Sequence, residues 1–164
     1  MPAYKTGSLA LLGTVIVILT ALGFEYLGGY KPCPLCLQQR WAYYTAMPVL
    51  FLALILLASE RPSWAGGLFL LVSLAFLANA GLGVYHAGAE WKFWPGPDTC
   101  GGVADLKVQA GGLLKQLETT RVIRCDEAPW RLFGLSFAGW NVVTSMLLWI
   151  TSLQAAFASA DAKR

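Results

Sequence analysis

Four long apolar stretches decide what this chain can fold into. They cover about residues 9–26, 41–59, 65–84 and 135–157, and each comes close to the roughly 20 helical residues that cross the hydrocarbon core of a bilayer. Only 13% of the residues are charged, whereas soluble domains carry about 25%. We therefore predict an all-α membrane protein, a four-transmembrane-helix bundle that forms a single integral domain over residues 1–164.

The number of spans fixes where the cysteines lie relative to the membrane. An even number places both termini on one side and the loops 27–40 and 85–134 on the other. All four cysteines fall in these two loops, so they face one compartment whichever way the chain is inserted. Within the second loop, the apolar spacing over residues 103–118 predicts a short helix lying on the bilayer surface.

Charge and chemistry disagree about the orientation. The cysteine-side loops carry 8 of the 12 lysine and arginine residues, and the positive-inside rule would place such loops in the cytosol. Stable disulfides, however, need an oxidising compartment, and we give this argument precedence. The net charge of +3 is scattered, so nucleic acid is excluded as a partner while a lipid bilayer is required. A cleaved signal peptide over the first span remains the alternative to four spans.

The spacing of the cysteines favours redox chemistry. A bridge between Cys33 and Cys36 constrains almost no chain, which is typical of an exchangeable disulfide, whereas Cys100 and Cys125 would close a larger loop worth about 3.5 kcal/mol. A permanent structural bridge remains open for the second pair. We expect no metal, because zinc and iron sites of the Cys-x-x-Cys type need a second close pair, and a haem site would need histidine where Leu37 stands.

Cys36 has surroundings that favour a thiolate. It falls in the first turn of the second span, where a helix N-terminus carries partial positive charge, and Arg40 follows one turn later. The alternative for Arg40 is a side chain that merely anchors the helix at the membrane interface. A thiolate with a cation beside it at the lipid boundary is suited to reducing a lipid-soluble acceptor such as a quinone.

Four segments together resemble the DsbB family of bacterial disulfide-forming membrane proteins, and the resemblance covers nearly the whole chain. These segments are Cys33-Pro-Leu-Cys36-Leu-Gln-Gln-Arg40, Tyr85-His86, Trp94-Pro-Gly-Pro before Cys100, and Cys125 followed by Trp130 to Asn141. The resemblance implies the bacterial inner membrane, with cytoplasmic termini and periplasmic cysteines.

The resemblance also implies a relay. A soluble, DsbA-like partner with a thioredoxin fold would attack Cys100, after which Cys125 would pass the exchange to Cys33. Cys36 would then be released as a thiolate facing a bound quinone, either ubiquinone or menaquinone.

Three further residues are implied for the quinone site. Arg40 and His86 would line the head-group site, with Gln39 as a weaker candidate; His86 alone would otherwise be read as a satisfied interfacial side chain. Two alternatives remain at this stage. One is an enzyme resembling vitamin K epoxide reductase, and the other is a non-catalytic bundle held by structural disulfides.

Overall fold

A computed structural model describes residues 2–96 and 125–162 of the chain. Cys100 and the helix predicted over residues 103–118 lie outside the described residues.

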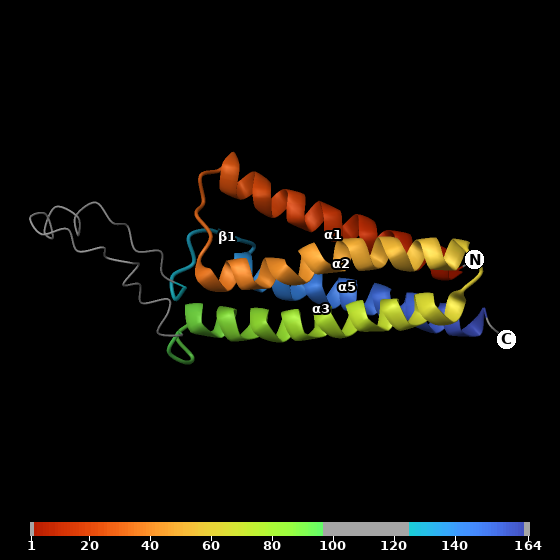
Figure 1. Cartoon of the computed structure of the whole chain (residues 1–164). Helices are drawn as coiled ribbons and strands as arrows, with labels where there is room; N and C mark the ends of the chain where they lie inside the picture. Colours follow the sequence, from red (N-terminus) through yellow and green to blue (C-terminus); the bar gives the residue numbers. More distant parts are fainter. Residues whose placement is uncertain (1, 97–124, 163–164) are drawn as a thin grey trace, which may run out of the picture.

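Four long helices form the molecule, as predicted. They are α1 (Pro2–Tyr26), α2 (Pro34–Ala58), α3 (Pro62–Glu90) and α5 (Phe137–Asp161). All four are long and apolar enough to cross a membrane. Figure 1 shows them running side by side, with the start of α1 and the end of α5 at the same end of the bundle. The prediction of a four-helix membrane bundle is confirmed.

The helices extend beyond the apolar stretches that predicted them. α2 begins at Pro34 and α3 ends at Glu90, so the loops expected over 27–40 and 85–134 are shorter than the sequence suggested. The start of α2 follows from its own sequence, because proline is preorganised for the first helical position and the Cys33 side chain caps the helix. Hydropathy marks only the lipid-facing part of a helix, and therefore Arg40 and His86 lie on helices and not in loops.

A short hairpin that the sequence analysis did not predict leads into α5. Strands β1 (Arg131–Leu132) and β2 (Leu135–Ser136) pair antiparallel. The turn residues Phe133 and Gly134 have φ angles of 52° and 81°, as a two-residue type I′ turn requires. Ser136 then caps α5 by accepting a hydrogen bond from the Gly139 amide at 3.2 Å. The hairpin fixes where the chain enters its last span.

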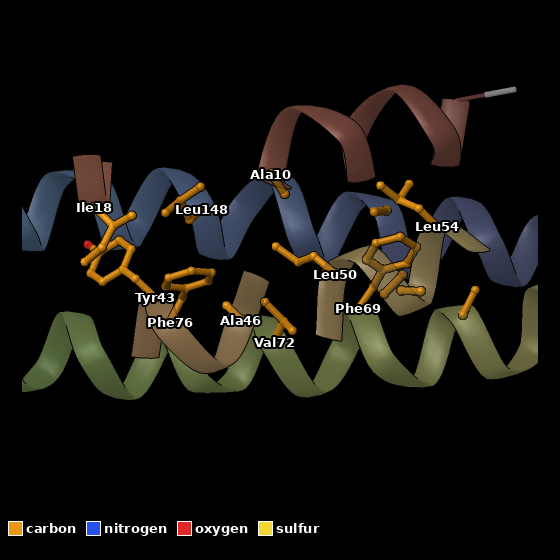
Figure 2. Close-up of a cluster of buried hydrophobic side chains, with 14 residues drawn as sticks. Ala10, Ile18, Tyr43, Ala46, Leu50, Leu54, Phe69, Val72, Phe76 and Leu148 are labelled. Atoms are coloured by element: carbon orange, nitrogen blue, oxygen red, sulfur yellow. The ribbon is translucent and has the colours of Figure 1, made fainter. Parts of the chain in front are cut away.

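The apolar core lies between α2 and α3, close to α5 and α1. Figure 2 shows Phe69, Leu50 and Phe76 among its largest members, and all three are fully buried. Near the N-terminus α1 packs tightly on this core, since a Cβ added at Gly7 would lie 2.6 Å from the Phe69 ring. Glycine is needed there for the two elements to approach.

A polar layer crosses the bundle just beyond the core. The Tyr43 hydroxyl donates to the Asn141 side-chain oxygen at 2.7 Å, and Asn79 donates to Ser145 at 2.9 Å. These bonds join α2, α3 and α5, and in lipid such contacts between helices substitute for hydrogen bonds to water. The layer lies between the apolar core and the cysteine end of the bundle.

Candidate functional site

The Cys33 and Cys36 thiols meet at the N-terminus of α2. Both cysteines are free, and their Sγ atoms are 2.7 Å apart. The Cys33 sulfur also accepts a hydrogen bond from the Cys36 amide at 3.2 Å. The local sequence creates this geometry, because a Cys-x-x-Cys segment that starts a helix places the first sulfur at the N-cap and the second in the first turn.

The environment of Cys33 favours its thiolate. The hydrogen bond from the Cys36 side chain, together with the interaction with His86, outweighs the opposing effect of burial and lowers the pKa of Cys33 to about 5. Helix N-terminal amides and nearby imidazoles stabilise thiolates in the same way. The sequence had suggested Cys36 for this charge, whereas in the reduced pair the capping amide points at Cys33.

His86 reaches the thiol pair from α3. Its Nε2 lies 3.7 Å from the Cys33 sulfur, and its Nδ1 lies 3.3 Å from the Gln39 side-chain nitrogen. The imidazole is only 2% exposed. Two residues implied by the family resemblance, His86 and Gln39, are therefore brought together with the cysteines by the packing of α2 against α3.

Glu90 is a member of this site that the sequence analysis missed. Its Oε1 lies 3.8 Å from His86 Nε2, and the residue is 7% exposed. Its Oε2 has no hydrogen-bond partner within the part of the chain that the structure describes. The available signal was the spacing, since Glu90 follows the only histidine by four residues and so lies on the same helix face.

Arg40 is held by the end of α1. It forms a close ion pair with Glu25 and donates to the Ala21 carbonyl oxygen at 3.4 Å. The sequence analysis placed Arg40 beside Cys36 and did not consider Glu25. Both residues of the pair are partly buried, and the pair ties α1 to α2 where the two helices are otherwise diverging (Figure 1).

Cys125, the first described residue after residue 96, lies beside the thiol pair. It is 1% exposed, packs in a small cluster with Cys33 and Leu35, and is disulfide-bonded. Cys100 lies outside the described residues, so the pairing of Cys100 with Cys125 stays a prediction. The position of Cys125 beside Cys33 brings two redox-active candidates together.

A large cavity opens beside these residues, with a volume of about 1110 Å³. Its polar end is lined by Cys33, Cys36, Gln39, Arg40, His86 and Glu90. Its apolar wall includes Ile16, Val17 and Phe24 of α1, and Tyr43 and Asn141 contribute polar atoms further down. Such a cavity suits an elongated, mostly apolar molecule with a small polar head.

The chain is similar to known proteins of disulfide bond formation. The chain is 30% identical to disulfide bond formation protein B of Marinobacter nauticus over 84% of this chain and 82% of that protein. It is 31% identical to the protein of the same name from Xanthomonas campestris pv. campestris, over 79% and 76% of the two chains. No solved structure matches.

A sequence model of one protein family matches more of the chain than these relatives do. The sequence model of the family described as "Disulfide bond formation protein DsbB" matches residues 5–155, which include α2, α3, most of α1 and α5, and all four cysteines. This match sets aside both the resemblance to vitamin K epoxide reductase and the non-catalytic bundle. The chain belongs to the DsbB family and is a multi-pass membrane protein of disulfide bond formation.

Proposed function

We propose that this protein reoxidises a DsbA-like, thioredoxin-fold partner and passes the electrons to membrane quinone. The observation that carries the proposal is the reduced Cys33 and Cys36 pair, which lines a cavity large enough for an amphipathic redox carrier. A structural disulfide protein would have no need of such a cavity beside its cysteines. The family assignment supports disulfide exchange in general, and the cavity supports the quinone.

The relay begins at the second cysteine pair. A thiolate of the reduced partner attacks Cys100 and breaks its bond to Cys125, whose released thiolate attacks Cys33 of an oxidised Cys33–Cys36 bridge. Cys36 then leaves as a thiolate. When the partner's second thiol breaks the mixed disulfide, the oxidised partner leaves and Cys100 is released as a thiolate. Cys100 then attacks Cys125, which restores the Cys100–Cys125 disulfide and frees Cys33. The partner's two electrons now reside in the Cys33 and Cys36 dithiol. The contact between Cys125 and Cys33 supports the second exchange.

The residues of the cavity fit a quinone head group. Arg40 and His86 are hydrogen-bond donors for carbonyl oxygens. Beside His86, the Glu90 carboxylate oxygen that has no hydrogen-bond partner among the described residues is a group able to carry a proton. Gln39 fixes the orientation of the imidazole. The quinone, ubiquinone or menaquinone, supplies a two-electron acceptor that leaves the dithiol as a disulfide. The chain's own residues hold the head group and supply the protons.

Redox potentials explain why such an acceptor is needed. DsbA has a potential of about −120 mV, and each 30 mV of mismatch costs about 1.4 kcal/mol for two electrons. A thiol relay alone would stall against so oxidising a partner. We place the cysteine end at the periplasmic face of the bacterial inner membrane and the termini in the cytoplasm, since only that face holds the partner and an oxidising environment.

Quinone reduction tests the proposal directly. The purified protein is mixed with a reduced DsbA-like protein and a short-chain ubiquinone, and the loss of quinone absorbance is followed. We expect reduction only when all three are present, and none with Cys36→Ser. Trp64→Phe, at an exposed site at the other end of α3, is the matched control and should retain the parental rate. Parental activity in Cys36→Ser would refute the assignment.

A further inference from the structure

We propose that the reduced Cys33 and Cys36 thiols, together with His86, form a binding site for a soft divalent cation such as Zn²⁺ or Cd²⁺. The ligand atoms of these three residues all lie within 4.8 Å of one another. Thiolate and imidazole ligands select such cations over Mg²⁺ or Ca²⁺, which prefer oxygen. A cation held there would occupy both sulfurs and so halt their redox chemistry.

The distances require only a small adjustment. Tetrahedral zinc with normal bond lengths separates a sulfur from a nitrogen ligand by about 3.6 Å, and two sulfurs by about 3.8 Å. Cys33 Sγ and His86 Nε2 already lie 3.7 Å apart. The two sulfurs, at 2.7 Å, must separate by about 1 Å. Cys36 is half-buried and lines the cavity, so a change in its side-chain torsion has room.

The surroundings complete a metal site. Gln39 lies 3.3 Å from the far nitrogen of the imidazole; with its amide turned over, the side-chain oxygen would accept the Nδ1–H that a histidine bound through Nε2 carries. Glu90 lies 3.8 Å from the nitrogen that would bind the metal, and its other carboxylate oxygen is buried and has no hydrogen-bond partner in residues 2–96 and 125–162. The Glu90 carboxylate, or a water molecule that it holds, is the fourth ligand.

The site exists in one redox state only. Binding to the dithiol, with Cys33 as thiolate and Cys36 as thiol, releases the proton of Cys36 and the Nε2 proton of the charged His86, and moves no electrons. A Cys33–Cys36 disulfide offers no thiolate, so the oxidised protein should not bind the cation. Metal binding and electron transfer to the acceptor therefore compete for the same reduced state. Loop residues such as Lys31 and Glu127 also line the cavity, which gives an ion a polar route from the cysteine end.

The sequence argument against a metal looked for a second close cysteine pair, and Cys100 and Cys125 do not form one. Folding supplies a histidine instead, 53 residues away from Cys33 along the chain. Because His86 is the only histidine, any histidine–metal signal from tag-free protein must come from this site. That property makes the proposal easy to test.

Cobalt titration of tag-free protein tests binding without partner or quinone. The protein is reduced under anaerobic conditions, freed of reductant, and titrated with Co²⁺ while sulfur-to-cobalt charge-transfer and tetrahedral d–d absorption are recorded. We expect one Co²⁺ per chain, displacement by Zn²⁺ but not by Mg²⁺, and no bands in the oxidised protein. The Cys100→Ser/Cys125→Ser variant should behave in the same way, which excludes the second thiol pair.

Three variants decide the ligand set. His86→Ala should weaken cobalt binding by at least about tenfold, and Cys36→Ser should remove the bands. Asp126→Asn, which changes a carboxylate that pairs with Lys92, is the matched control and should bind within twofold of the parent. Equal affinity in His86→Ala and parent would overturn the proposal, as would bands that survive in Cys36→Ser. Helical circular dichroism checks that each variant is folded.

A separate measurement links the site to activity and rests on the proposed function. Zn²⁺ should stop quinone reduction, and a chelator should restore it. Cobalt bands without any quinone reduction by metal-free protein would uphold the metal site and refute the proposed function. Quinone reduction that proceeds at full rate at saturating Zn²⁺ would overturn the claim that the cation halts the thiol pair.

Discussion

The two ends of the bundle are built differently. At the end that carries the termini, Leu50, Phe69 and Ala65 are completely buried, and α1 approaches so closely that only glycine fits at Gly7. At the cysteine end α1 leans away (Figure 1), and its last fully buried residue is Ile18. One end holds the helices together by close packing, and the other leaves a cavity.

The open end also holds the buried acidic and basic side chains of the described residues. His86 and Glu90 are buried there, although buried charges are costly unless they are paired. At the packed end, buried charges would serve no function. At the open end, they lower the pKa of Cys33 and line the cavity. The contrast suggests that substitutions at one end will change stability and those at the other will change activity.

The largest expected effect is the loss of activity in Cys33→Ala. This change removes the sulfur that receives the exchange from Cys125, so turnover with a reduced partner should fall by at least about 10³-fold, as when an enzyme loses its nucleophile. The free energy of unfolding should fall by only about 1–2 kcal/mol, since the change removes one small buried sulfur and the side-chain cap of α2. Quinone absorbance and detergent unfolding measure the two quantities. A large loss of stability in Cys33→Ala would contradict the idea that substitutions at the open end affect activity and those at the packed end affect stability.

The converse change is Phe69→Ala at the packed end. Truncating a buried phenylalanine leaves a cavity and costs about 3 kcal/mol, at the low end of the range for such changes because lipid chains also solvate the ring when the helices separate. Unfolding in sodium dodecyl sulfate measures this loss. Phe51→Ala, on the exposed face of α2, is the control and should cost much less. Turnover per folded molecule should be unchanged in both variants.

The same contrast explains what the sequence could predict. The membrane spans could be predicted because a stretch of about 20 apolar residues is typical of a transmembrane helix. The sequence spacing of Cys33 and Cys36 identified the dithiol. Asn79 and Asn141, polar residues within apolar spans, bond to each other across α3 and α5. The ends of the helices could not be predicted from hydropathy, because Pro34 and the Cys33 cap extend α2 beyond its apolar part.

Pairings between helices were the least readable part of the site. Glu25 gave no signal of its own, since a carboxylate near a span end is usually a solvated group, and only packing shows that it takes the charge of Arg40. Glu90 gave only its spacing of four residues from His86, and the structure adds that both side chains are buried. The placement of the thiolate at Cys33 similarly depends on its contacts with the Cys36 side chain and with His86, which spacing alone does not give.

The pH dependence of Cys33 alkylation probes the polar end. With the pKa of Cys33 lowered to about 5, the thiolate predominates above that pH, and the rate of reaction with iodoacetamide should fall as the pH drops through about 5. His86→Ala removes a hydrogen bond and a favourable charge, so the midpoint should move to higher pH. Mass spectrometry of the Cys33 peptide reports the rate. Phe69→Ala should leave the midpoint unchanged.

The smallest effect is expected for Glu25→Gln, which tests whether the ion pair of Arg40 holds the open end in shape. Partly exposed ion pairs contribute about 0.5–1 kcal/mol, so the KM for quinone should change by only about two- to fivefold. The direction discriminates between two roles. If Glu25 competes with the head group for Arg40, the KM falls; if it positions Arg40 and α1, the KM rises.

We expect the KM for quinone to rise in Glu25→Gln, because the pair is the tie between α1 and α2 at the level where α1 has left the bundle. Lys92→Gln, which breaks a more exposed ion pair with Asp126 at the same end, controls for general loss of charge and should leave the KM within experimental error. An unchanged KM in Glu25→Gln would mean that the cavity keeps its shape without this tie, and that the open end is held by the packing below it.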